Sequence, residues 1–242
     1  MTDDGSPPPD PGVRDAVRQA LSVSFATGLY GVSFGALSTV AGLSLAQTAV
    51  LSLLMFSGGS QFALVGVVGG GGAPVSAILS ASFLGVRNAL YGIRLGPLLA
   101  LHGWRRVLAA HLTIDESTAV ATAQSTRRAA RAGFWWTGVG VFVLWNAFVL
   151  AGALAGDALA DPGRWGLDAA AAAAFLGLLW PRLSTREVRL VVLAAGTLAL
   201  VLVPLAPPGV PVLAAAALAV VISRTPAGRR PAADDAGPGV AA

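Results

Sequence analysis

Residues 133–155 read GFWWTGVGVFVLWNAFVLAGALA, an apolar stretch without a charged side chain. A helix needs about 20 apolar residues to cross the hydrocarbon core of a bilayer, so this stretch predicts a membrane-spanning helix. Similar apolar runs occur on both sides of it, at 19–40, 45–70, 74–101, 107–124, 167–181, 188–204 and 210–223. The sequence therefore predicts an all-α protein, a polytopic membrane helix bundle of about seven to eight hydrophobic segments, some of them broken or re-entrant.

The composition of the whole chain also favours a protein that lies in a lipid bilayer. Of its 242 residues, 55% are hydrophobic and 12% are charged, whereas soluble domains carry about 25% charged residues. This shortage of charge argues against a soluble enzyme and against a disordered chain. The chain has no cysteine and only two histidines, so we expect no metal site. It also has no lysine and hence no phosphate-binding loop of the ATPase type, and we expect no cofactor.

Both ends of the chain differ from the apolar middle. Residues 1–13 and 224–242 are rich in proline, glycine and charged side chains, which is typical of disordered tails. We therefore expect a transmembrane transporter domain at 14–223, between a disordered N-terminal tail and a disordered C-terminal tail.

The arginines predict how the segments are oriented. They form short clusters between the apolar runs, at 14–18, 105–106, 127–131, 182–189 and 224–230. Cytoplasmic loops carry such an excess of basic residues, so we expect a multi-pass protein of the cytoplasmic (inner) membrane with both termini in the cytoplasm. Clusters between apolar runs also argue against binding to nucleic acid. Eight crossings would place residues 105–106 outside, unless the 45–70 or the 107–124 run turns back without crossing, and the sequence leaves this open.

The 45–70 run is broken in its middle by the residues Ser57, Gly58, Gly59, Ser60 and Gln61. Lipid offers no hydrogen bonds, so a broken helix must be buried in protein or line a wet cavity. A helix that begins at this break would present free N–H groups to a carboxylate. We therefore expect all five residues to contribute to a substrate-binding site.

Glycines also punctuate the first apolar run, at Gly28, Gly31 and Gly35. Small residues allow helices to pack closely, and a glycine-interrupted helix is also typical of transporter binding sites. Both interpretations stay open, and Gly35 is included among the substrate-binding candidates.

Charged side chains within two of the runs are expected to face each other. Arg87 lies in the 74–101 run with Asn88 beside it, and Asp115 and Glu116 in the 107–124 run are the only acids between residues 16 and 156. An ion inside a bilayer is costly and tends to persist only with a partner and a use. Arg87 and Asn88 would bind a substrate carboxylate, with Asp115 and Glu116 as proton-coupling groups. The alternatives are a structural ion pair, or acids that lie in water on an interfacial helix.

Arg94 and His111 lie close to these charges in the sequence. Arg94 follows Arg87 by seven residues and shares its helix face, but it is near the end of the run, where its side chain can reach the headgroups. His111 precedes Asp115 by four residues and could join a proton relay. The sequence decides neither role.

Two short segments resemble each other. Residues 29–37 read LYGVSFGAL and residues 90–98 read LYGIRLGPL, and these segments contain both tyrosines of the chain. Transporters often repeat a glycine- or proline-interrupted helix in two halves, with the substrate bound where the halves meet. Coincidence in so biased a composition is the alternative.

Several motifs follow one another in a characteristic order. They are GVSFGALSTVAGLSLAQ (31–47), SGGSQFALVG (57–66), VRNALYG (86–92), LTIDESTAV (112–120) and GLDAAAAAAFLGLLWP (166–181). In this order and at these spacings they resemble the azaleucine-resistance (AzlC) family of branched-chain amino acid permeases, specifically its large subunit. The resemblance implies a helix bundle in the cytoplasmic membrane that exports branched-chain or similar amino acids. It also implies a small membrane subunit of the AzlD type as partner.

The function expected from these features is export of branched-chain or related hydrophobic amino acids by a permease subunit, with proton coupling as the candidate drive. The expected partners are the small amino acid substrate, the lipid bilayer and the AzlD-type subunit. A channel-like pore for small solutes and a non-transporting membrane scaffold are the alternatives. An enzyme is not expected, because the chain contains no H-E-x-x-H, and Phe62 takes the place of the second glycine in the G-x-S-x-G pattern around Ser60.

Overall fold

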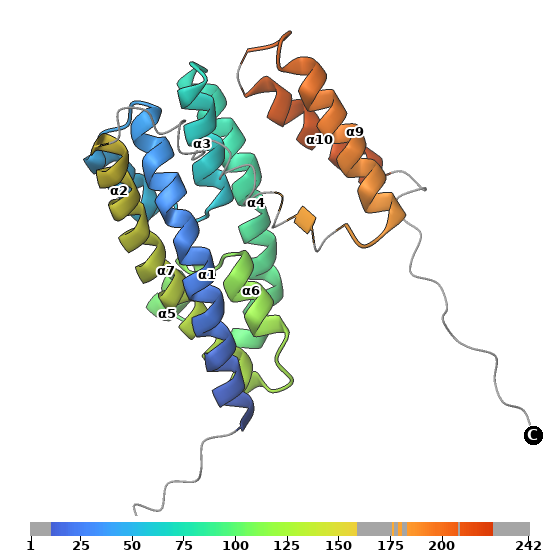
Figure 1. Ribbon diagram of the computed structural model, residues 1–242. Helices are drawn as coiled ribbons and strands as arrows, with labels where there is room; N and C mark the ends of the chain where they lie inside the picture. The colour runs from blue at the N-terminus through green and yellow to red at the C-terminus, as the bar shows by residue number, and fades with distance from the viewer. Residues whose placement is uncertain (1–10, 159–175, 177–178, 181–182, 208, 225–242) are drawn as a thin grey trace, which may run out of the picture. The chain divides into compact units, whose positions relative to one another are not determined.

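The computed structural model describes residues 11–158, 176, 179–180, 183–207 and 209–224, and the regular elements in these ranges are all helical (Figure 1). The helices are α1 (Pro11–Val40), α2 (Leu45–Leu54), α3 (Gly59–Gly69), α4 (Pro74–Leu99), α5 (Trp104–His111), α6 (Asp115–Thr122), α7 (Arg127–Ala158), α9 (Arg186–Leu202) and α10 (Val210–Arg224). The chain divides into one compact unit up to Gly177 and a second from Leu178. In the second unit α9 and α10 pack against each other.

The predicted apolar runs correspond to these helices, with one exception. The run at 167–181 falls almost entirely outside the described residues. Most of the two predicted tails also lies outside them, although α1 already begins at Pro11, where proline is favourable as a first helical residue. By length and composition, two of the described helices are long and apolar enough to cross a membrane, namely α1 and residues 127–156 of α7. The total of seven to eight membrane segments stays a prediction.

The two long helices α1 and α7 approach each other very closely. A Cβ atom at Gly31 would lie 2.7 Å from the carbonyl oxygen of Trp145, and one at Gly35 would collide with the backbone of Val149 and Ala153. Gly152 meets the backbone of α1 in the same way. The glycines of the first run thus serve helix packing, as small residues do in membrane bundles.

Gly35→Ala is therefore expected to lower the melting temperature of the detergent-solubilised protein, because overpacking of a tight contact costs about 1–3 kcal/mol. Gly66→Ala on α3 is the matched control, since a Cβ atom there meets nothing within 4 Å. Thermal unfolding followed by fluorescence measures both variants. Equal melting temperatures would contradict the close contact.

The runs 45–70 and 107–124 each break into two short helices that turn back on each other (Figure 1). Ser44 caps the start of α2, where it accepts a hydrogen bond from the Gln47 N–H. Gly58 has a φ of +37° at the turn into α3, a conformation that favours glycine. We call α2–α3 the first hairpin and α5–α6 the second hairpin.

The two hairpins enter the first unit from opposite ends, and their tips meet in its middle (Figure 1). The ring of Phe56, in the first tip, lies 6.0 Å from that of His111, in the second, between centroids. Both rings contact Phe142 of α7, at 5.1 and 5.6 Å. Each run therefore folds back on itself within the first unit.

The order of elements in the first unit is repeated. The long helix α1 is followed by the first hairpin, and the long helix α4, which runs in the opposite direction, is followed by the second (Figure 1). The similar segments 29–37 and 90–98 lie in α1 and α4 respectively. This correspondence favours an inverted repeat over coincidence.

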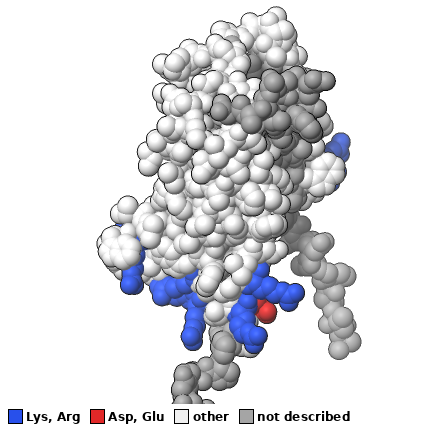
Figure 2. Space-filling view, turned by 60° about the vertical axis from the view of Figure 1, so that its left-hand side comes forward, with Lys and Arg blue, Asp and Glu red and all other residues white. Residues whose placement is uncertain are grey.

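The start of α1, the turn from α4 into α5 and the connection from α6 to α7 lie at the same end of this unit (Figure 1). A hydrogen bond of 3.0 Å between the side chains of Gln124 and Gln19 joins two of these places. We call this the arginine-rich end, because it carries Arg14, Arg18, Arg105, Arg106, Arg127, Arg128 and Arg131. Figure 2 shows most of the basic side chains gathered at the lower end of a surface that is otherwise almost without charge.

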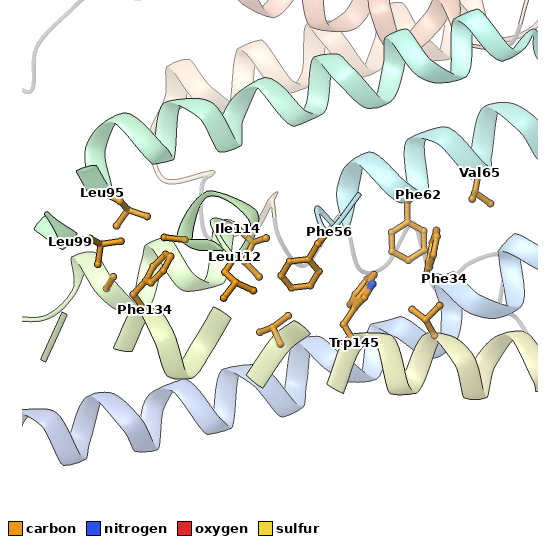
Figure 3. Close-up of a cluster of buried hydrophobic side chains, with 14 residues drawn as sticks. Phe34, Phe56, Phe62, Val65, Leu95, Leu99, Leu112, Ile114, Phe134 and Trp145 are labelled. Carbon is orange, nitrogen blue, oxygen red and sulfur yellow. The ribbon is translucent and has the colours of Figure 1, made fainter. Parts of the chain in front are cut away.

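Aromatic side chains fill the core between the hairpin tips and the end of the unit that lies opposite the arginine-rich end (Figure 3). Phe34 of α1 lies 5.4 Å from Phe62 of α3 and 6.1 Å from Trp145 of α7, measured between ring centroids. All three are nearly inaccessible to solvent. This aromatic cluster, Phe34, Phe62 and Trp145, fixes the first hairpin against α1 and α7.

Candidate functional site

Arg87, in the middle of α4, connects the tips of both hairpins. Its Nη1 atom lies 2.9 Å from Oδ2 of Asp115 at the start of α6, and its Nη2 donates to the carbonyl oxygen of Ser57, at 3.2 Å. The two charged side chains are 28% and 12% exposed. The structure thus brings Arg87 and Asp115 together as an ion pair. A mostly buried ion pair of this kind needs good geometry and further hydrogen bonds to offset the loss of hydration.

Neighbouring residues of α4 supply those hydrogen bonds. The Tyr91 hydroxyl donates to Oδ1 of Asp115 at 2.5 Å, so α4 engages both carboxylate oxygens. The Asn88 amide donates to the Ser57 hydroxyl at 3.1 Å, and this hydroxyl lies 3.1 Å from that of Ser60. One helix therefore holds the first hairpin through Ser57 and the second through Asp115.

Tyr91 is a member of the site that sequence reasoning missed. Its position four residues after Arg87 places it on the same helix face, and this spacing was the available signal. Thr27 of α1, which lies close to the side chain of Glu116, gave no such signal. Glu116 lies next to the pair, near enough to Asp115 and Arg87 to interact with both electrostatically.

Two buried polar atoms beside the pair have no hydrogen-bond partner among the described residues. They are Nε of Arg87, a donor, and Oδ1 of Asn88, an acceptor. Buried polar atoms are nearly always paired in proteins, so unpaired ones call for an explanation. An unpaired donor and an unpaired acceptor on consecutive residues suit the carboxylate and the ammonium of an amino acid.

The other residues predicted to bind the substrate hold the hairpin or pack the helices. Gln61 is fully buried and donates to the carbonyl oxygens of Leu51 and Ser52, at 3.4 and 3.3 Å, so it fastens the end of α2. Gly58 forms the turn of the first tip, and Gly59 is the buried first residue of α3. Gly35 lies at the contact between α1 and α7, and the hydrogen-bonded cluster does not include it.

The remaining polar residues take other surroundings. Arg94 is exposed, towards the arginine-rich end of α4. His111 is half-buried against Phe56 and Phe142, as described above. Among the described residues, no group of three or more histidines, cysteines or acids could hold a metal ion.

The region from α1 to α7 is also the part of the chain that a protein-family model matches. The family description "AzlC protein" matches residues 22–159. The chain belongs to the AzlC family. The matched part contains the Arg87–Asp115 ion pair and the residues that form hydrogen bonds around it, whereas α9 and α10 lie beyond it. Family membership and the apolar helices support a membrane protein with a transport-related role. No curated protein and no solved structure matches the chain.

Proposed function

We propose that this AzlC-family chain is the large subunit of a multi-pass exporter for branched-chain or related hydrophobic amino acids. The observation that carries the proposal is the Arg87–Asp115 pair, held between the tips of two hairpins in the middle of the bundle. Backbone that breaks at membrane depth is tolerated only in protein or beside a wet cavity. Charged groups at that depth tend to mark a transport path.

The substrate carboxylate competes with Asp115 for Arg87 in the proposed cycle. A guanidinium presents a planar fork that fits a carboxylate, and the Nε atom of Arg87 is a further donor on the same fork. Oδ1 of Asn88 accepts a hydrogen bond from the substrate ammonium. An aliphatic side chain then lies against the apolar residues of the hairpin tips.

Asp115 loses its partner when the substrate binds in this way. A buried carboxylate without a counter-charge is costly, so it takes up a proton. Glu116, beside it, offers a second site for that proton. Release of the substrate restores the ion pair and expels the proton, and this alternation couples export to a proton gradient.

The arginine-rich end faces the cytoplasm in this proposal, following the excess of basic residues in cytoplasmic loops. The N-terminus is then cytoplasmic, α1, α4 and α7 cross the membrane, and the two hairpins are re-entrant. If the run at 167–181, α9 and α10 cross as well, the C-terminus is also cytoplasmic. The protein would belong to the cytoplasmic (inner) membrane.

Amino acid efflux tests the proposed function. Cells loaded with a branched-chain amino acid are compared with and without this chain, and with and without a small AzlD-type membrane subunit. Saturable efflux that requires the chain, and that the small subunit increases, is expected. A conductance without saturable amino acid efflux would favour a channel. Assembly with the subunit without any flux would favour a scaffold.

A further inference from the structure

A cleft of about 540 Å³ lies between the second half of α4 and helix α5. Much of its lining consists of small residues, namely Ala89, Gly92 and Gly96 of α4 and Ala109 and Ala110 of α5. A Cβ atom at Gly92 or Gly96 would meet nothing within 4 Å, so the described structure leaves this face of α4 without a closely packed neighbour. In membrane proteins, small residues of this kind let a second helix approach closely.

The inverted repeat gives this face of α4 a counterpart on α1. Tyr91 of α4 follows Tyr30 of α1 by 61 residues. The same offset relates most of the buried residues of α4 to buried residues of α1: Ala77, Ala81, Leu95 and Leu99 of α4 correspond to Ala16, Ala20, Phe34 and Ser38 of α1. The two long helices therefore bury the same positions, which fixes the register of the repeat.

In this register, the glycines of the cleft correspond to the glycines that hold α7. Gly92 and Gly96 are the counterparts of Gly31 and Gly35, respectively. A Cβ atom at Gly31 or Gly35 would collide with the backbone of α7. The same two positions thus pack against a helix in α1 and are uncovered in α4.

The helices of the hairpins extend this correspondence. In the first repeat α7 packs against both α1 and α2. The cleft lies between α4 and α5, which are the corresponding helices of the second repeat. Helix α5 buries only Ala109, and its Trp104 and Val107 are 71% and 73% exposed. The cleft therefore has the place in the second repeat that α7 fills in the first.

The correspondence also predicts the direction and the surface of a helix that would fill the cleft. Gly31 lies against Trp145 and Gly35 against Val149, so α7 runs parallel to α1. A helix in the cleft would likewise run parallel to α4 and end at the arginine-rich end. Gly152 of α7 meets the backbone of α1, and the helix in the cleft also needs small residues at its contact.

Arg106 of α5 adds a requirement for charge. It lines the cleft, and no acid among the described residues forms an ion pair with it. An acidic side chain near the end of the incoming helix would complement this arginine. The other apolar runs of the chain lack such an acid, because Arg182 follows the run at 167–181, uncharged residues follow that at 188–204, and Arg224 follows that at 210–223. A helix of a second chain therefore suits the cleft better.

We propose that this cleft is the docking site for a membrane-spanning helix of a second chain. That helix runs parallel to α4, presents small residues to Gly92 and Gly96, and carries an acid beside Arg106. It completes the second repeat as α7 completes the first. The small membrane subunit of the exporter supplies this helix, and this assignment rests on the proposed function.

Substitutions that fill the cleft test the docking site. Gly92→Leu and Gly96→Leu each place a side chain where the second helix would lie. The full chain is produced together with a tagged small AzlD-type subunit, and the complex recovered in mild detergent is measured. Each substitution is expected to reduce the recovered complex at least about tenfold, because overpacking opposes a close helix contact. The melting temperature of the chain alone should stay that of the wild type, since neither Cβ atom meets a neighbour.

Gly66→Leu on α3 is the matched control for the loss of space. A Cβ atom at Gly66 also meets nothing within 4 Å, and Gly66 does not line the cleft, so the complex should persist. Arg106→Glu tests the charge and is expected to weaken the complex. Arg105→Glu is its control, since Arg105 is exposed on the same helix and does not line the cleft.

Recovery of the complex does not require transport, so it separates the two proposals. A complex that the cleft variants form as well as the wild type does would reject the docking site, even with efflux intact. A complex that depends on the cleft, in cells without amino acid efflux, would reject the exporter and support the docking site.

Three further outcomes would overturn the assignment to a second, smaller chain. A lower melting temperature of the Gly92→Leu chain alone would show that a segment of the same chain fills the cleft. Loss of self-association in that variant would show that a second copy does so. A wild-type chain that does not co-purify with the small subunit would leave lipid as the neighbour of this face.

Discussion

Arg87→Lys is expected to abolish export while the protein still reaches the membrane. Lysine keeps the positive charge near Asp115 but has no planar fork for a carboxylate. The substitution also removes the geometry by which Arg87 reaches Asp115 and Ser57 at the same time. Efflux of a branched-chain amino acid, normalised to the amount of protein in the membrane, measures the effect. A loss of at least about tenfold is expected, which corresponds to about 1.4 kcal/mol.

Arg94→Lys is the matched control for this change. Arg94 lies on the same helix, seven residues further on, and is exposed. Its substitution is expected to leave efflux near that of the wild type, because exposed charges contribute little. Equal effects of the two substitutions would contradict a special role for Arg87.

A double substitution distinguishes a substrate site from a structural ion pair. Removal of one partner leaves a buried charge unpaired and costs about 3–5 kcal/mol, whereas replacement of both by apolar residues is often neutral for folding. Arg87→Leu with Asp115→Leu is therefore expected to restore the amount of folded protein relative to Arg87→Leu alone, without restoring efflux. Restored efflux would show that the pair is structural only.

Asp115→Asn with Glu116→Gln is expected to remove the dependence of export on an imposed proton gradient. In the wild type, acid outside is expected to slow export, because the proposed cycle takes up a proton when the substrate binds inside and releases that proton with the substrate outside. The neutral amides cannot exchange protons, so efflux of the double variant should be the same at every gradient. The Tyr91 hydroxyl can still donate to an amide oxygen at position 115, which preserves local structure.

Asp15→Asn is the control for the gradient experiment. Asp15 is exposed in the first turns of α1, at the arginine-rich end. Its variant should respond to the gradient as the wild type does. An unchanged gradient response in the Asp115 and Glu116 double variant would reject these carboxylates as the coupling groups.

The sequence predicts the helices and one contact of the site well, for physical reasons. Apolar runs report the lipid-compatible segments directly. Arg87 and Asp115 could be paired because the acids at 115–116 are the only ones over a long stretch of the chain, so a buried arginine there had few possible partners. The breaks near Ser57 and before Asp115 were visible as polar residues inside apolar runs.

Other features depend on how distant helices are placed, which no local pattern reveals. The hydroxyl of Tyr91 and the carbonyl of Ser57 become ligands of the pair only because the hairpin tips meet beside α4. Gly35 and Gly92 look alike in the sequence, but the first lies against a helix backbone and the second borders a cleft. That the 45–70 and 107–124 runs each fold into a hairpin is likewise visible only in the structure.

Binding of leucine and of leucinamide to the purified full chain tests the central claim most directly. Leucinamide keeps the ammonium and the aliphatic side chain but has no carboxylate for Arg87. Isothermal calorimetry is expected to show saturable binding of leucine, at least about tenfold tighter than that of the amide. The variant with leucine at both positions 87 and 115 should not distinguish the two ligands. Equal affinity of the wild type for leucine and leucinamide would contradict the claim that Arg87 binds the substrate carboxylate.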